Sequence, residues 1–178
     1  GTYLKPYLIN KRVFIITNKT VSALYKIKLE KILIQKGIKT NFIILKDGED
    51  QKNLKTISKV SLLLLKKGID RNDSIVAFGG GVIGDMCGLL SSLYLRGTYY
   101  FHIPSTMTAI VVSCIGGING INYKNIINSL GSYYHPRRVY ISEKVIKKLP
   151  NREYYSGFAE ILKCGLIGNN KIIEILKK

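Results

Sequence analysis

Short apolar runs alternate along the chain with longer segments in which apolar residues recur every three or four positions. The short runs have the length and β-branched content of strands, and the longer segments have the period of helices. Strand and helix in regular alternation predict a parallel sheet covered by helices, an α/β fold of Rossmann-like type. The predicted strands are 12–17, 41–46, 74–78 and 98–104, and the predicted helices are 21–33, 54–64 and 86–95.

The pattern of apolar and polar residues changes after residue 142. From Glu143 onward the pattern is helical throughout, and the last segment, KIIEILKK, is still apolar on one side. We therefore predict a Rossmann-like domain over 1–142 and the beginning of an incomplete helical domain over 143–178. A helix with an unburied apolar stripe needs a partner to cover it.

Composition narrows the function classes. The formal charge is 28 − 11 = +17, which is compatible with nucleic-acid binding. Most of the cations, however, are lysines scattered along the chain, whereas proteins that recognise specific bases usually do so with arginine. The strongest local signal for nucleic acid is His135-Pro136-Arg137-Arg138, and the composition as a whole disfavours that function. Residues 97–123 carry no charge, yet their proline, glycines and asparagines suit a membrane span poorly. Three widely spaced cysteines and no visible leader segment fit a reducing cytoplasm.

One glycine turn carries the first chemical signal. Gly79, Gly81 and Gly84 form G-x-G-x-x-G between the run SIVAF and a predicted helix. Bare backbone at a helix N-terminus lets a pyrophosphate approach the N–H groups. The Rossmann pattern also expects an acid about 20 residues later, and that position falls near Pro104. A tight structural turn therefore remains an alternative on this motif alone.

Four longer segments decide between these alternatives. DGEDQKNL, GIDRNDSIVAFGGGVIGDMCGLL, YLRGTYYFHIPSTM and LPNREYYSGFAEILKCGLI occur in this order and spacing. Together they resemble the 3-dehydroquinate synthase family, from about Asn18 onward. The resemblance implies an NAD- and metal-dependent, phosphate-eliminating lyase of the shikimate pathway, with zinc or cobalt as the metal. Its substrate would be 3-deoxy-D-arabino-heptulosonate 7-phosphate, and its products 3-dehydroquinate and phosphate.

The resemblance also implies roles for individual residues. A metal-binding role falls on Glu160, and substrate or catalytic roles fall on Arg96, Asn128 and Lys163, with Arg96 reaching the site of a second subunit in a homodimer. Without the resemblance, the spacing of Glu160 and Lys163 on one helix predicts a surface ion pair. The implied NAD-binding residues are Asp47, Gly48, Glu49, Lys52, Gly81, Val82, Gly84, Asp85, Ser105 and Thr106.

The sequence departs from the family pattern at charged positions. An aspartate and two lysines of that pattern fall on Val112, Ile118 and Ile127, and we expect these β-branched residues to preserve a strand there. The family's two histidine metal ligands have no counterpart, because His102 and His135 stand elsewhere, in a predicted strand and a predicted loop.

Several functions therefore stay open. One hypothesis is an active synthase, completed by a separate C-terminal polypeptide that supplies the histidines. Another is an inactive NAD-binding remnant or an interaction subunit. A sister activity on another phosphorylated sugar and a basic nucleic-acid binder are further alternatives.

Overall fold

The computed structural model describes residues 12–177, and the predicted alternation of strand and helix is confirmed there. The main sheet is parallel, with strand order β2-β1-β3-β4-β7. Its strands are β1 (Arg12–Asn18), β2 (Lys39–Leu45), β3 (Ser74–Gly79), β4 (Tyr99–Pro104) and β7 (Arg138–Val139). β3 is buried at every position, as expected for a central strand with helices on both faces.

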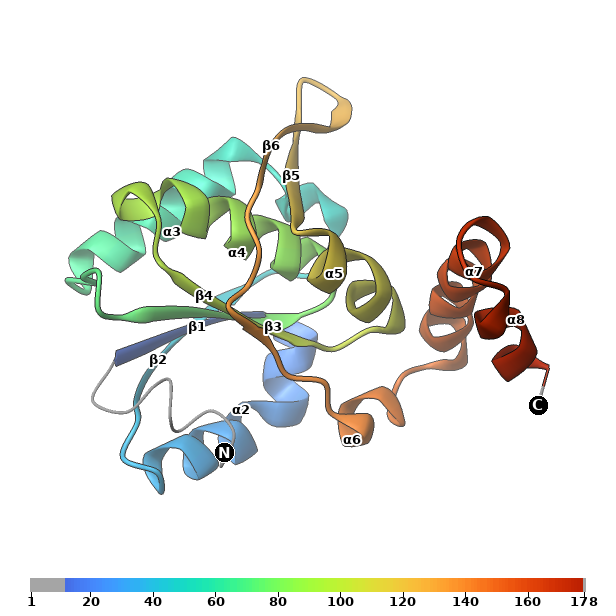
Figure 1. Cartoon of the computed structure of the whole chain (residues 1–178). Coiled ribbons are helices and arrows are strands. Elements are labelled where there is room, and N and C mark those ends of the chain that lie inside the picture. Colours follow the sequence, from blue (N-terminus) through green and yellow to red (C-terminus); the bar gives the residue numbers. More distant parts are fainter. Residues whose placement is uncertain (1–11, 178) are drawn as a thin grey trace.

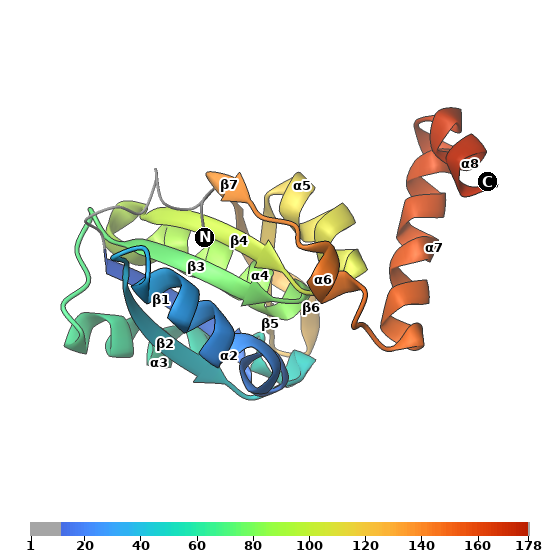
Figure 2. The same cartoon turned by 90° about the horizontal axis from the view of Figure 1, so that it is seen from below.

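Helices cover the two faces of this sheet (Figure 2). On one face lies α2 (Lys19–Ile34), which buries Val21 and Leu33 against apolar side chains of β1 and β3. On the other lie α3 (Leu54–Lys66) and α4 (Gly81–Leu93). Helix α3 begins where the Asn53 side chain caps the amide of Thr56, at 2.8 Å, and turns Ile57, Val60 and Leu64 to the core. Short 3-10 turns occupy Glu49–Gln51 and Tyr94–Arg96.

A β-hairpin leaves the body beside α4 (Figure 1). It consists of β5 (Ile118–Tyr123) and β6 (Ile126–Tyr133), paired antiparallel. Its turn is Lys124-Asn125, where both residues have positive φ, 46° and 64°. Asn-Gly is a dipeptide common in hairpin turns, yet Asn119-Gly120 lies inside β5.

The expectation of strand at all three substituted positions was wrong for Val112. Residues Ala109–Ser113 form a π-helical segment, followed by the short helix α5 (Cys114–Gly116). Ile118 and Ile127 do lie in strands β5 and β6. A π-helical turn is a feature found disproportionately at functional sites, because the wider turn re-aims side chains.

The chain ends in helices, as predicted: α6 (Glu143–Ile146), α7 (Asn151–Ile167) and α8 (Asn170–Leu176). The pair α7–α8 stands apart from the sheet (Figures 1 and 2). Helix α7 approaches the body where Gly157 meets Met107, and a side chain at position 157 would collide with that methionine. Within residues 12–177 no helix is long and apolar enough to cross a membrane. The predicted boundary at 142 falls between β7 and α6, and residues 1–11 of the first predicted domain lie outside the described range.

Candidate NAD-binding pocket

A cavity of about 700 Å³ opens at the carboxyl ends of the strands. Residues at or just beyond the ends of β1, β2, β3 and β4 line it, among them Asn18, Asp47, Gly80 and Ser105. The chain runs from β1 outward to β2 and then returns to the other side of β1 for β3. Ligands of open α/β sheets bind at such a switch point, so the topology alone places a binding site here.

The glycine turn forms the middle of the cavity wall. Gly80 precedes α4, Gly81 is its first residue, and no side chain caps this N-terminus. A Cβ atom at Gly80 would lie 3.2 Å from Thr106 Cγ2, so the backbone and the next loop approach closely. The first turn of α4 also carries no acidic residue. Free N–H groups and the positive end of the helix dipole therefore face the cavity, which suits an anionic group.

A polar cluster marks the end of the cavity on the α4 side. Lys52 is buried, with 5% of its surface exposed, and its Nζ lies 2.9 Å from Asp85 Oδ2 and 2.6 Å from Asn128 Oδ1. Glu49 Oε1 lies 3.3 Å from the same nitrogen. Burial raises the pKa of Asp85, while hydrogen bonds from Lys52 and from the Ser113 hydroxyl oppose that rise. The cluster joins the 49–52 turn, α4 and the hairpin into one wall.

Apolar side chains line the cavity on the α2 side. They come from the first turns of α2 and from the chain that follows β7, in and after α6. They are Val21, Leu24, Tyr25, Val145 and Leu149, and the charged Lys148 and Glu153 line the cavity as well. One cavity thus combines apolar side chains, a glycine turn suited to an anion, and a polar cluster.

His102 lies directly beneath the glycine turn without lining the cavity. It is fully buried in β4, its Nδ1 is 3.3 Å from Cys114 Sγ, and its ring abuts Gly84 so closely that a Cβ there would collide with it. Burial lowers the pKa of His102 to about 4 and raises that of Cys114 to about 12. Both groups are therefore neutral at pH 7, and the two side chains stabilise the glycine turn by packing beneath it.

The structure brings most of the sequence-predicted cofactor residues together. Nine of the ten line the cavity: Asp47, Gly48, Glu49, Lys52, Gly81, Val82, Asp85, Ser105 and Thr106. Gly84 does not line it and serves close packing against His102. Asn128, predicted for substrate, contacts Lys52 from the hairpin.

The remaining predicted residues lie away from the cavity. Arg96 is exposed at the far end of α4, and its backbone and that of Leu95 have positive φ, 63° and 51°. Glu160 and Lys163 form an ion pair on α7, with side chains 31% and 54% exposed. The surface ion pair predicted from these two residues alone is thus confirmed.

The described residues do not form a metal site. Among residues 12–177 there is no group of three or more His, Cys, Asp or Glu side chains placed to hold an ion. Glu160 has Lys163 as its partner instead. Because a catalytic zinc needs three protein ligands, the described residues do not bind one by themselves.

Sequence reasoning missed several residues of the cavity wall. Ser113 reaches it through the π-helical turn, and Val145, Lys148 and Glu153 reach it because the chain after β7 folds back over the carboxyl edge. Of the three apolar substitutions, Val112 lines the cavity, while Ile118 and Ile127 are 57% and 72% exposed on the hairpin. Among the described residues, no acid lines the cavity near Pro104, where the Rossmann pattern would place one. Asp47 lines it just after β2, before the glycine turn in the chain, together with Glu49, Asp85 and Glu153.

The 3-dehydroquinate synthase N-terminal family model matches residues 42–156. The chain belongs to the 3-dehydroquinate synthase family. It is 44% identical to the 3-dehydroquinate synthase of Dictyoglomus thermophilum over 98% of this chain and 49% of that protein. It is 40% identical to the chloroplastic enzyme of Solanum lycopersicum over 96% of this chain and 39% of that protein. The chain therefore spans about half the length, or less, of these relatives.

Solved structures of sugar phosphate cyclases have the same fold. A 2-epi-5-epi-valiolone synthase from Streptomyces hygroscopicus, with NAD+ and Zn2+ bound, superposes with a TM-score of 0.89 at 30% identity, over 93% of this chain and 46% of that one. A 2-deoxy-scyllo-inosose synthase complexed with carbaglucose-6-phosphate, NAD+ and Co2+ gives 0.85 at 25% identity, over 91% and 45%. The Rossmann-like fold expected from the sequence is confirmed.

Proposed function

We propose that the cavity binds NAD, and the observation that carries this proposal is that three kinds of lining occur together in one cavity. The apolar side chains of Val21 and Tyr25 suit an adenine ring, and the uncapped N-terminus of α4 suits the pyrophosphate. The polar end around Lys52 and Asp85 then receives the nicotinamide side. The NAD+ bound in the two cyclase structures supports the same cofactor.

We further propose that this chain is the cofactor-binding half of a 3-dehydroquinate synthase. The reaction would convert 3-deoxy-D-arabino-heptulosonate 7-phosphate to 3-dehydroquinate and phosphate. A nicotinamide cofactor held here would supply reversible oxidation of a substrate alcohol, in which the carbinol carbon gives up a hydride and the hydroxyl a proton, and the resulting ketone would acidify the neighbouring C–H bond. The chain's own residues would hold and orient the cofactor: Gly81 by leaving its backbone bare, and the Lys52–Asp85 pair by fixing the polar end.

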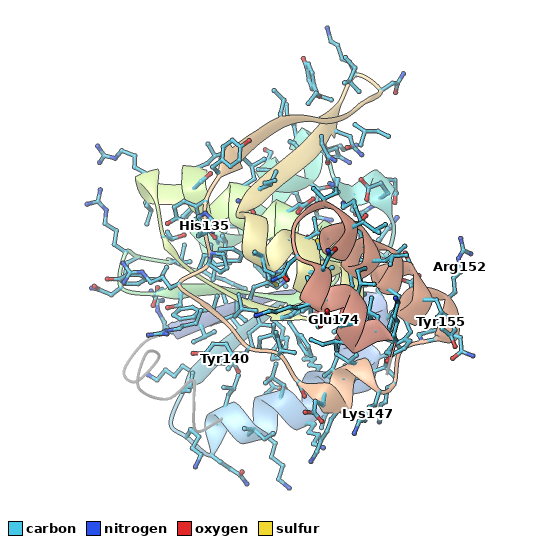
Figure 3. The ribbon with its side chains drawn as sticks, turned by 45° about the vertical axis from the view of Figure 1, so that its right-hand side comes forward. His135, Tyr140, Lys147, Arg152, Tyr155 and Glu174 are labelled. Atoms are coloured by element: carbon cyan, nitrogen blue, oxygen red, sulfur yellow. The ribbon has the colours of Figure 1, made fainter. Side chains whose placement is uncertain are left out.

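The metal would have to come with ligands from outside the described residues. Glu160 is one donor, and the exposed apolar side chains of α7 and α8 offer a surface for a helical partner. Tyr155 projects outward from α7 (Figure 3), and Leu166, Ile167 and Ile175 are each 70% exposed or more. We infer that the helical half of the family covers this surface, as a continuation of the chain or as a separate polypeptide.

Arg96 supports a dimeric enzyme. Its guanidinium stands outside the cavity of its own chain, as a role in the site of a second copy would require. Planar, bidentate guanidinium groups suit phosphate recognition. We infer a homodimer in which the two copies exchange this arginine. Three free cysteines in the described chain agree with a cytoplasmic location.

A second function is favoured by the apolar substitutions. Val112 in the cavity wall and Ile118 and Ile127 on the hairpin supply no charge where the family pattern has charged groups. An inactive NAD-binding remnant, or an interaction subunit, would retain the glycine turn and tolerate these changes.

Two measurements test these functions in order. Calorimetric titration with NAD+ tests the cofactor proposal, and absence of binding at millimolar NAD+ would overturn it. Phosphate release is then measured with NAD+, zinc or cobalt and the separately expressed C-terminal half of the Dictyoglomus enzyme, with that complete enzyme as control. Metal-dependent release identifies a synthase half. Binding of NAD+ without release identifies the remnant, and release only from another phosphorylated sugar identifies a sister cyclase.

A further inference from the structure

Asn122 stands at an irregularity of the β5–β6 hairpin. Ile121 pairs with Leu130 and Tyr123 with Ile126, so Asn122 alone lies opposite residues 127–129 of β6 and has no regular cross-strand partner. The extra residues of this bulge therefore belong to β6, and Asn128 is the middle one. Asn122 forms hydrogen bonds with the 49–52 segment of the cavity wall instead.

Three hydrogen bonds then connect Asn122 to the polar end of the cavity. Its backbone N–H donates to the Lys52 carbonyl at 2.7 Å, and its Nδ2 donates to Glu49 Oε1 at 3.2 Å. Its Oδ1 accepts from the backbone N–H of Asn128 at 2.9 Å. One residue of β5 thus holds both ends of the 49–52 turn and the neighbouring strand.

The bond to Asn128 has a specific consequence. Asn128 has a left-handed backbone, with φ 52°, and in this conformation its side-chain oxygen lies 2.6 Å from Lys52 Nζ. A left-handed asparagine persists only where its surroundings hold it. The Asn122 amide oxygen is such a restraint, acting on the N–H group of the residue concerned.

We propose that Asn122 is a positioning residue for the cofactor site. It presets the backbone of Asn128 and the carboxylate of Glu49 so that Lys52 is held in place before the cofactor binds. This inference rests on the proposed binding of NAD, and it concerns a residue that lines no part of the cavity itself.

The test compares Asn122→Ala with Ser129→Ala. Ser129 lies on the same hairpin, and its hydroxyl donates within the hairpin, to Ile126 O at 3.1 Å, without contacting the 49–52 segment. We expect Asn122→Ala to raise the Kd for NAD+ about five- to tenfold, the effect of losing one or two preset hydrogen bonds. Ser129→Ala is expected to stay within about twofold.

A double-mutant cycle separates positioning from a general loss of structure. Glycine tolerates positive φ, so Asn128→Gly removes the side chain that contacts Lys52 without straining the backbone. In that background Asn122→Ala should raise the Kd by a smaller factor than in the parent, because only the hydrogen bond to Glu49 is left to lose. Hydrogen exchange should show the Asn128 amide protected in the parent chain and exposed in Asn122→Ala.

The outcomes are distinct. If the parent chain does not bind NAD+, the proposed function fails and this inference fails with it. If the parent binds NAD+ but Asn122→Ala matches Ser129→Ala, or weakens binding equally in both backgrounds, only the inference is overturned.

Discussion

The ammonium nitrogen of Lys52 lies 2.9 Å from a carboxylate oxygen of Asp85, although 33 residues separate them. Lys52 follows the 3-10 turn after β2, and Asp85 lies in the first turns of α4, so the pair spans the switch point of the sheet. The lysine side chain is 6% exposed and the aspartate 17%. Charges so little hydrated are retained only with partners, and each holds the other at the cavity wall.

Replacing Lys52 by methionine should therefore affect binding and stability together. Loss of one partner from a buried pair costs about 3–5 kcal/mol, and the partial exposure of Asp85 places this case near about 3 kcal/mol or below. Without the lysine, the pKa of Asp85 should rise further, because burial would act unopposed except by Ser113. Chemical denaturation and NAD+ titration measure the two effects.

Lys55→Met is the matched control for this substitution. Lys55 is exposed on α3, three residues along the chain, and lies outside the cavity. We expect its stability to stay within about 0.5 kcal/mol of the parent and its NAD+ affinity to be unchanged. Equal effects of the two variants would mean that net charge matters and the buried pair does not.

Two glycines of the same motif should respond differently to alanine. At Gly81 a new Cβ would lie 3.5 Å from Ser113 Oγ, an ordinary contact, but it would occupy the cavity over the helix N-terminus. Gly81→Ala should thus weaken NAD+ binding by about tenfold or more, about 1.4 kcal/mol, with little change in unfolding free energy.

Gly84→Ala should lower the free energy of unfolding more than it weakens NAD+ binding. Its Cβ would collide with the buried His102 ring, and overpacking of this kind costs about 1–3 kcal/mol. Thermal melts of both variants, each with and without NAD+, separate the two roles. A Gly81→Ala chain that melts far below the parent yet still binds NAD+ would contradict the assignment.

These glycines also illustrate what the sequence could predict. The run SIVAF before them and the apolar period after them fix strand β3 and helix α4, because local hydrophobic spacing and glycine at the junction suffice for that. The resemblance of whole motifs added the cofactor residues. It could not separate Gly81 from Gly84, since the difference depends on a histidine in β4, 18 residues away in the chain.

Other parts of the site depend on tertiary packing and left no local signal. The hairpin turn uses Lys124-Asn125 with positive φ, where a glycine would have been the usual marker. Ser113 enters the cavity only because a π-helical turn re-aims it, and Lys148 only because the chain after β7 crosses back. Asn122 stands opposite a bulge of β6 for which the sequence carries no marker.

We expect the stability of the fold to decrease in acid because of His102. Its pKa is lowered by burial from 6.5 to about 4, so the unfolded chain takes up a proton at higher pH than the folded chain. The free energy of unfolding is therefore not reduced by His102 above pH 6.5. It falls as the pH drops from 6.5 toward 4, by roughly 3 kcal/mol in total. Urea denaturation at several pH values measures this slope.

His102→Gln should flatten the slope between pH 6.5 and 4, because glutamine does not titrate there. His135→Gln, which replaces the exposed loop histidine, should retain it. If both variants keep the parent slope, another group causes the acid sensitivity and the buried histidine does not.

Arg96 offers a separation of stability from function. Left-handed backbone costs a non-glycine residue about 1–2 kcal/mol, and glycine avoids this cost while losing about 0.5–1 kcal/mol in unfolded-state entropy. With φ at 63°, Arg96→Gly should therefore stabilise the chain by about 0.5–1 kcal/mol. Binding of NAD+ should be unchanged, since Arg96 lies outside the cavity. Phosphate release in the reconstituted enzyme should fall by about 10- to 100-fold, as expected when a charged contact to substrate is lost. An Arg96→Gly enzyme that is both more stable and fully active would show that the strained arginine does not serve a substrate phosphate in either copy.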